Sequence, residues 1–305
     1  MKFLAIETSC DDTSVAIVDS SRNVLGMKTL SQFEHAKFGG VVPEVASRHH
    51  EDSILEASLS ALEMANLSVN DIGAVCVASN PGLVGSLLVG ISFAHGVSLA
   101  LNVPLIEVNH IESHAISAVI SNKNLEPPFV SLVVSGGHTS VIDVESFTKY
   151  KTYFHTVDDA VGEVLDKVAR EMGIPYPGGA ILDSMALRGD RDFFKMPRPK
   201  ISNFSFSGIK TWAIEIVKKL GKNHRNDLAS SLVFEISEYI SDYTLKVAKQ
   251  SERKQICIGG GVAASKVLRQ VLSKKCAKNK IDLFFPDIKY CQDNAAMIGI
   301  RGMFG

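Results

Sequence analysis

The sequence predicts an α/β fold made of two lobes that share one plan. A hairpin of two short apolar strands, Phe3–Ile6 and Val15–Val18, recurs about halfway along the chain as Phe129–Val134 and Val141–Val144. Helical and strand patterns alternate after each hairpin, which is typical of sheets covered by helices. The repeat therefore indicates two sheets of similar build rather than one large sheet.

The break between the lobes is expected in the polar stretch Asn122–Pro128, which ends in two prolines. We therefore predict a first lobe over residues 1–125 and a second lobe over residues 126–292.

In the first lobe, Leu55, Leu59 and Leu62 recur on one helical face. The apolar stretch around Leu83–Leu101 is interrupted by glycine, serine and histidine, so we expect a buried helix, from about Leu87 to Leu101, rather than a membrane span. Apolar runs predict two further strands of this lobe, at Ala74–Ala78 and Val103–Val108.

In the second lobe, Asp158–Met172 is amphipathic and predicts a helix with one apolar stripe. The segment Pro175–Gly208 is rich in glycine, proline and charge, and is either an ordered site loop or a mobile one. The remaining patterns predict helices at Asp227–Gln250 and Lys266–Lys278 and a strand at Gln255–Ile258.

The composition sets broad limits on function. The 305 residues include 46% apolar types and carry a net charge of −1, so no charge excess indicates a nucleic-acid or membrane partner. The five cysteines form no C-x-x-C pair, and their odd number argues against a disulfide framework. A reducing compartment is therefore expected, and we predict a cytoplasmic protein.

His110 and His114 lie four residues apart, which on a helix places both imidazoles on one face and within reach of one metal ion. Two surface or capping histidines are the alternative. A third ligand must come from elsewhere in the chain, and Asp293 is a candidate because it opens the last predicted helix. Its simpler role would be to cap that helix.

Three glycine-rich turns could bring backbone N–H groups close to a phosphate or acyl oxygen. They are Ser135-Gly136-Gly137, Pro177-Gly178-Gly179 and Gly259-Gly260-Gly261. Tight turns without a ligand are the alternative for each. The sequence contains neither a Walker P-loop nor the G-x-G-x-x-G dinucleotide motif.

Charged residues give weaker indications. Asp11 and Asp12, in the first hairpin turn, could bind a cation or accept a proton, although acids are common in turns. Lys210 could meet a phosphate or simply be a surface lysine. Asp159, Glu163, Asp166 and Arg170 share one face of the predicted 158–172 helix, which on periodicity alone is most simply a solvated face.

Nine stretches of the chain, in this order and spacing, resemble the tRNA N6-adenosine threonylcarbamoyltransferase family, formerly the O-sialoglycoprotein endopeptidase-like family. Together they cover nearly the whole chain. They read IETSCDDTSVAI, GGVVPEVASRHH, NPGLVGSLLVG, NHIESHA, VSGGHTS, DDAVGEVLDKVAREMGIPYPGG, FSFSGIKT, GGGVAAS and QDNAAMIG.

The resemblance implies an actin-like/Hsp70-like ATPase fold, with two RNase H-like lobes and a nucleotide cleft between them. The second lobe would carry a helical insertion, and a last helix at about residues 293–305 would pack back on the first lobe. The implied reaction transfers a threonylcarbamoyl group from threonylcarbamoyl-adenylate to N6 of adenosine 37, in tRNAs that read codons beginning with A. AMP leaves.

The resemblance also assigns roles to residues. His110, His114 and Asp293 would bind one divalent metal ion, usually Fe²⁺ in this family, with Zn²⁺ or Mg²⁺ proposed for relatives. Separately from the resemblance, the location of Asp11 and Asp12 in the first hairpin turn makes either of them a candidate to take the proton. Contacts to threonylcarbamoyl-adenylate, or to ATP or AMP, would come from Val133, Val134, Ser135, Gly136, Gly137, Asp166, Gly179, Asp183 and Ser265.

The chain departs from the family pattern at two of these positions. The family usually has Glu where this chain has Asp12, and often Asn where it has Ser265. A shorter acid and a hydroxyl in place of an amide are expected to change affinity more than the class of reaction.

The implied partners are tRNA, an inactive paralogous actin-like subunit and a small P-loop ATPase, with no membrane. Basic residues that could contact tRNA phosphates lie in two stretches, although a solvated surface is the simpler explanation of each stretch alone. They are Lys195, Arg198 and Lys200, and Lys218, Lys219 and Lys222.

Other functions remain open at this point. A carbamoyltransferase acting on a small molecule could use the same metal site, whereas an actin-like ATPase or kinase needs no pair of histidines. A metalloprotease would require H-E-x-x-H, which the chain lacks. A non-catalytic scaffold is disfavoured because the inactive paralogue lacks the paired histidines that this chain keeps.

Overall fold

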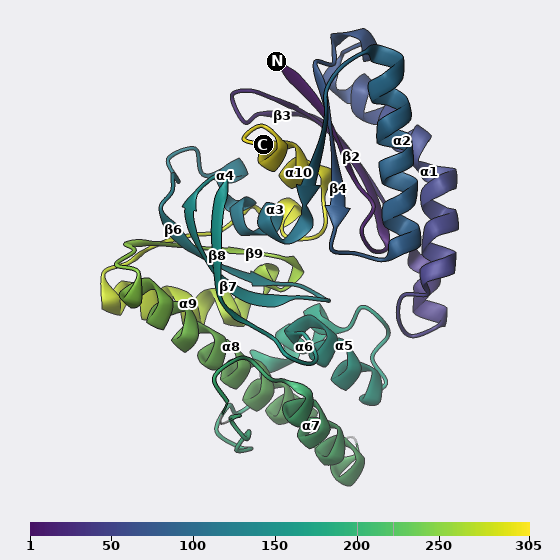
Figure 1. The fold of residues 1–305 in the computed structure, drawn as a ribbon. Coiled ribbons are helices and arrows are strands. Elements are labelled where there is room, and N and C mark those ends of the chain that lie inside the picture. The colour runs from purple at the N-terminus through teal and green to yellow at the C-terminus, as the bar shows by residue number, and fades with distance from the viewer. Residues whose placement is uncertain (200, 222) are drawn as a thin grey trace. The chain divides into compact units, whose positions relative to one another are not determined.

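The structure is a computed structural model that describes residues 1–199, 201–221 and 223–305, without the side chains of Phe33 and Ala36. The chain divides into two compact units (Figure 1). Unit 1 contains Met1–Leu125 and Gln292–Gly305, and unit 2 contains Glu126–Cys291.

Unit 1 is built on a five-stranded mixed sheet in the order β3-β2-β1-β4-β5. The first three strands are antiparallel neighbours, whereas β4 and β5 join the sheet in parallel to β1. The strands are β1 (Lys2–Glu7), β2 (Asp12–Asp19), β3 (Val24–Ser31), β4 (Ala74–Asn80) and β5 (Leu105–Asn109).

Helices cover both faces of this sheet, and Figure 1 shows α10 on the face opposite α1 and α2. Leu4 and Ile6 of β1 belong to the apolar cluster beneath α1 and α2, and the alternate residue Ala5 lies against Gly299 of α10. A Cβ on Gly299 would come within 3.0 Å of Ala5, so this glycine allows the close approach of α10. The helices are α1 (Pro43–Ala65), α2 (Val84–Leu101), α3 (His110–Ile116), α4 (Ala118–Ser121) and α10 (Ala295–Gly302), with 3-10 turns at Phe33–Lys37 and Val69–Asp71.

Unit 2 repeats the plan with a sheet in the order β10-β9-β6-β7-β8. Again three antiparallel strands are followed by two that join in parallel. The prediction of an α/β fold with a repeated hairpin is thereby confirmed. The strands are β6 (Phe129–Val134), β7 (Thr139–Ser146), β8 (Lys149–His155), β9 (Gln255–Gly259) and β10 (Asp282–Phe284).

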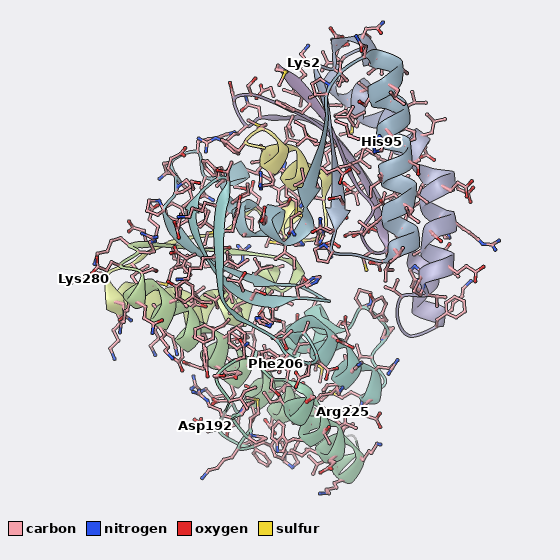
Figure 2. The ribbon with its side chains drawn as sticks, viewed as in Figure 1. Lys2, His95, Asp192, Phe206, Arg225 and Lys280 are labelled. Carbon is pink, nitrogen blue, oxygen red and sulfur yellow. The ribbon has the colours of Figure 1, made fainter. Side chains whose placement is uncertain are left out.

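The helices of unit 2 share one large apolar core with β6, β7 and β9. Phe206, labelled in Figure 2, is fully buried in it. The segment Pro175–Gly208 contains a helix, so the described part of it is not simply a loop. The helices are α5 (Val161–Glu171), α6 (Gly179–Ala186), α7 (Ser207–Leu220), α8 (Arg225–Gln250) and α9 (Lys266–Asn279), with 3-10 turns at Gly261–Ala264 and Ile288–Tyr290.

The expectation of a buried helix at Leu87–Leu101 is wrong for most of its surface. Within the described residues, α2 is the one helix that is long and apolar enough to cross a membrane, yet only 22% of it is buried. Small residues of α2 such as Gly90 and Ala94 are buried in the interior of unit 1, whereas Leu88 and Leu99 are exposed. Length and composition alone are weak evidence of a membrane span, because helices of soluble proteins also meet them.

The leucines of α1 also lie differently from a core stripe. Leu62 is buried, but Leu55 and Leu59 are exposed, because the sheet contacts the face that carries Ile54 and Ala61. Unit 1 therefore presents an apolar surface on α1 and α2, formed by Leu55, Leu59, Met64, Val84, Leu88 and Leu99.

Candidate functional site

The two predicted histidine ligands are held by α3, which begins directly after β5. The Asn109 side chain caps this helix by accepting hydrogen bonds from the backbone N–H groups of Ile111 and Glu112. His110 and His114 lie one turn apart and are both buried. Their ring centroids are 4.6 Å apart, so the helix presents the two imidazoles side by side.

The predicted carboxylate ligand meets these two rings. Asp293 Oδ1 lies 2.9 Å from His114 Nε2 and 3.7 Å from His110 Nε2. Each residue offers one ligand atom, and all three atoms lie within 4.8 Å of one another. Ligands about 2.0–2.2 Å from one ion stand about 3 Å apart at a right angle. The spacing therefore fits one divalent ion, and the set of two imidazoles and one carboxylate leaves further coordination positions open.

The alternative role of Asp293, capping the last helix, belongs to its neighbour. The Asn294 side chain accepts the hydrogen bond from Met297 N and is the N-cap of α10. The hydroxyl of Ser14 in β2 accepts from Ala295 N, which ties the start of α10 to the sheet. The Asp293 carboxylate is therefore not needed to cap α10.

Glu7, which the sequence reasoning did not select, contacts the first histidine. Its Oε2 lies 2.8 Å from His110 Nδ1, and both side chains are almost completely buried. Burial lowers the pKa of His110, but the charges of Glu7 and Asp293 and the Glu7 hydrogen bond raise it to about 9. The site therefore favours positive charge, and a bound cation would displace the proton. The position of Glu7 at the end of a predicted strand was the only feature of the sequence that could have indicated its role.

The two candidate catalytic acids follow β1. Burial, together with the nearby charges of Asp293, Asp11 and Glu7, raises the pKa of Asp12 to about 7, against a hydrogen bond from Ser31. Burial and the Asp11 carboxylate raise the pKa of the Cys10 thiol far above its ordinary value, so it is not a thiolate nucleophile.

In unit 2, the turn after β6 exposes its two glycines. The Ser135 hydroxyl accepts from His138 N, and Ser135 N donates to the His138 carbonyl, which closes the turn. Within the described chain, the N–H groups of Gly136 and Gly137 have no acceptor, and a Cβ at either position would meet nothing. Val133 and Val134 are fully buried, so only their backbone could reach a ligand.

Two other glycines crowd this turn. A Cβ on Gly162 of α5 would lie 2.6 Å from the Ser135 carbonyl oxygen. Gly260, after β9, has a φ of +90°, and a Cβ there would lie 2.3 Å from the Val134 carbonyl oxygen. The glycines therefore bring the start of α5 and the end of β9 against one turn, at the carboxyl ends of β6 and β9.

The predicted substrate residues Asp166 and Asp183 hold backbone segments in place. Asp166 Oδ1 accepts from Gly178 N at 2.8 Å and Gly179 N at 2.9 Å, so this turn directs its N–H groups to a carboxylate. Asp183 accepts from the Ser265 hydroxyl and from the first backbone N–H groups of α9. Among the predicted glycine turns, the one at 178–179 thus has its donors already satisfied.

Lys210 and Arg198, the candidates for contacts to phosphate groups, form ion pairs with carboxylates of this chain. Lys210 Nζ lies 2.7 Å from the Asp159 carboxylate. Arg198 bridges Glu235 and Asp242 of α8. Lys195, Lys218 and Lys219 are exposed. Lys200 and Lys222 lie outside the described residues.

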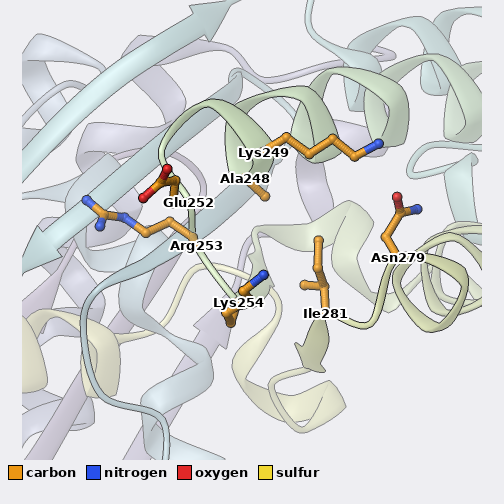
Figure 3. A pocket seen from close by; sticks show the side chains of 7 residues that line it. All are labelled: Ala248, Lys249, Glu252, Arg253, Lys254, Asn279 and Ile281. Carbon is orange, nitrogen blue, oxygen red and sulfur yellow. The ribbon is translucent and has the colours of Figure 1, made fainter.

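A pocket of about 420 Å³ lies on unit 2 between the C-terminal ends of α8 and α9 (Figure 3). None of the predicted site residues lines it. Lys249 in the last turn of α8 lines it and is placed where a cation stabilises the helix dipole. Its lining is Ala248, Lys249, Glu252, Arg253, Lys254, Asn279 and Ile281.

Comparisons with known proteins agree on one family. The family model for TsaD, the tRNA N6-adenosine threonylcarbamoyltransferase, matches residues 23–300. A protein of that name from Caldicellulosiruptor saccharolyticus is 45% identical over all of this chain and 93% of its own length. Another, from Fusobacterium nucleatum, is 44% identical over 98% of this chain and 89% of its own length.

Solved structures support the predicted actin-like fold class. HypF from T. kodakarensis superposes with a TM-score of 0.67 at 14% identity, over 99% of this chain and 47% of that one. Component A of the Acidaminococcus fermentans (R)-2-hydroxyglutaryl-CoA dehydratase gives a TM-score of 0.60 at 15% identity, over 100% and 98% of the two chains. Similarity at this level of identity describes the fold alone.

Proposed function

Because the chain belongs to the tRNA N6-adenosine threonylcarbamoyltransferase family and is a transferase that acts on tRNA, we propose that it catalyses the following complete reaction. It transfers threonylcarbamoyl from threonylcarbamoyl-adenylate to N6 of adenosine 37 in tRNAs that read codons beginning with A, and releases AMP. The similarity across the whole chain is the observation that carries this proposal. It favours neither a small-molecule carbamoyltransferase nor an actin-like ATPase or kinase.

His110, His114 and Asp293 would hold the divalent ion, for which Fe²⁺ is our first candidate and Zn²⁺ or Mg²⁺ the alternatives. The spacing of their ligand atoms supports this assignment. When bound, such an ion supplies a Lewis acid for the phosphate and acyl oxygens of the adenylate.

The exposed turn at Gly136 and Gly137 would donate backbone hydrogen bonds to oxygens of the acyl-adenylate. Its free N–H groups and open surroundings support that role. Fixed donors of this kind stabilise the charge that develops on a carbonyl or a departing phosphate. Asp166, Gly179, Asp183 and Ser265 would shape the neighbouring surface, because their hydrogen bonds fix the turn at 178–179 and the start of α9.

Asp12 would accept the proton that N6 loses during transfer. A carboxylate whose pKa is raised to about 7 is suited to proton transfer near neutral pH. Asp11, in the same turn, remains the second candidate.

The apolar surface on α1 and α2 would bind the paralogous actin-like subunit. Leu99 is 80% exposed and Leu88 is 57% exposed, and large apolar side chains exposed on neighbouring helices are the kind of surface that binds a protein partner. We propose the paralogue as the partner because the family resemblance implies such a subunit. A small P-loop ATPase would be the third component of the complex. We place the complex in the cytoplasm.

The reaction is tested by incubating the protein with threonylcarbamoyl-adenylate and unmodified tRNA, with and without the two partners. Nucleosides released from the tRNA are then analysed by mass spectrometry. We expect threonylcarbamoyladenosine at position 37. Its absence under every condition, from protein that is folded and metal-loaded, would refute the proposed function.

A further inference from the structure

Glu7 is a buried carboxylate at the end of β1, and a histidine is its neighbour. The side chain has 0% exposure. Oε1 accepts a hydrogen bond from Ser9 N at 2.5 Å, and Oε2 lies 2.8 Å from His110 Nδ1. Within the described residues, no lysine or arginine forms an ion pair with it. The carboxylate thus depends on Ser9 and His110.

An ionised carboxylate is stable in the interior of a protein only where strong hydrogen bonds replace those that it made to water. Glu7 can only accept hydrogen bonds when it is ionised. The adjacent His110 nitrogen must therefore carry a hydrogen. With the hydrogen on Nδ1, the neutral ring has its lone pair on Nε2, the atom that lies 3.7 Å from Asp293.

We propose that Glu7 is a positioning residue that fixes His110 in the Nδ1–H form, so that Nε2 offers its lone pair to the cation. This inference rests on the proposed function, because it requires the three-residue site to bind a divalent ion. A partner of this kind also fixes the ring orientation and makes the ligand nitrogen more basic.

The second histidine provides an internal contrast. His114 Nδ1 is buried and has no hydrogen-bond partner among the described residues. Glu7 therefore acts on one ring of the pair. The Ser9 hydroxyl lies 3.1 Å from the same His110 Nδ1 that Glu7 contacts, so two oxygen atoms meet this one ring nitrogen.

Glu7→Gln separates the chemical role from the structural one because it preserves the size of the side chain. The amide oxygen can still accept from Ser9 N. The amide NH₂ would then face His110 Nδ1 and select the opposite tautomer, with the hydrogen on Nε2, where the cation needs a lone pair.

The experiment measures Zn²⁺ affinity by competition with a chelator in the wild-type protein, Glu7→Gln and a control. The control, Glu112→Gln, lies on the same helix as the two histidines but forms an ion pair with Arg301, 3.0 Å away, instead of contacting them. We expect Glu7→Gln to weaken Zn²⁺ binding about 10–100-fold. Glu112→Gln should stay within about twofold. Equal affinity in folded Glu7→Gln and wild type would overturn the inference.

A second measurement needs no variant. Nitrogen NMR of the zinc-loaded wild type should show His110 protonated at Nδ1 and coordinated through Nε2. The reverse pattern would refute the role of Glu7 even if Glu7→Gln failed to fold. A folded wild-type protein that binds no Zn²⁺, Fe²⁺ or Mg²⁺ would instead overturn the proposed metal site, and this inference with it.

Discussion

The hydroxyl of Ser265 donates a hydrogen bond to Asp183 Oδ1 at a distance of 2.5 Å. The same hydroxyl oxygen accepts from Leu268 N, so Ser265 is also the N-cap of α9. The position where the family often has Asn is thus part of the frame of unit 2. A substitution at Ser265 would therefore affect a bound ligand both by direct contact and by shifting Asp183 and the start of α9.

Ser265→Ala should lower the free energy of unfolding by about 1–2 kcal/mol, because it removes the cap and one donor to a buried carboxylate. Ser265→Asn should lower the free energy of unfolding by less, since an asparagine side chain can also cap a helix. Urea denaturation measures both. An alanine variant as stable as the wild type would contradict the capping role.

His114→Ala should abolish binding of the divalent ion and lower transferase activity by more than about 100-fold, because it removes a ligand rather than a group behind one. Metal content after purification and release of modified nucleoside from tRNA are the two measurements. Adding the ion should raise the thermal midpoint of the wild type but not of the variant. Full activity in His114→Ala would end the metal role of this site.

Arg198 is expected to contribute little to tRNA binding, because Glu235 and Asp242 already accept from its guanidinium group. Arg198→Ala should leave unchanged the slope of log affinity against log salt concentration. A phosphate contact would instead reduce that slope by about one. Lys218 is an exposed lysine of α7, and the salt dependence of tRNA binding by Lys218→Ala is measured in the same titration for comparison with Arg198→Ala.

The spacing of the two histidines predicts that their rings lie together, whereas no local pattern predicts which groups Asp166 and Asp183 contact, and the difference has a physical reason. The i, i+4 spacing of His110 and His114 fixes their common face once α3 forms. Asp166 and Asp183, in contrast, accept hydrogen bonds from segments distant in sequence, and no local pattern contains that information. The buried pairing of Glu7 with His110 spans 103 residues and was missed for the same reason.

The element predictions fail mainly where burial is one-sided. β8 lies at the edge of the sheet, where its residues are exposed or half-buried, so it has no apolar run and no strand was predicted there. The helix predicted from Asp158 begins only at Val161. The Asp158 side chain instead accepts from Phe206 N at the start of α7.

Leu99→Asp should disrupt association with the paralogous subunit while barely changing the stability of the isolated chain. The side chain is already 80% exposed, so its replacement removes little buried apolar area, but a charge would be desolvated in an apolar interface. Light scattering of the mixed proteins measures the complex. Ile288→Asp, at another exposed apolar residue but in unit 2, is the control and should leave the complex intact. An unchanged complex with Leu99→Asp would place the partner elsewhere.

Asp158 should make the stability of unit 2 dependent on pH in the acid range. Its carboxylate accepts from Ser205, Phe206 and Ser207 around the start of α7. Burial opposes the charge, but these hydrogen bonds outweigh it and hold the pKa of Asp158 below its ordinary value of 3.8. A carboxyl whose folded pKa is lowered stabilises the fold above the unfolded pKa, and this contribution disappears as pH falls through the folded pKa.

Asp158→Asn should therefore cost about 1 kcal/mol at pH 7, a value at the lower end for a cap because the group is exposed to solvent. The difference from wild type should shrink as the pH falls below about 4 and vanish once the wild-type carboxyl is protonated. Urea denaturation at several pH values measures it. Asp192→Asn, at an exposed aspartate (Figure 2), should show no comparable difference at any pH. A difference for Asp158→Asn that persists unchanged at pH 2 would show that packing, rather than the charge, gives Asp158 its effect.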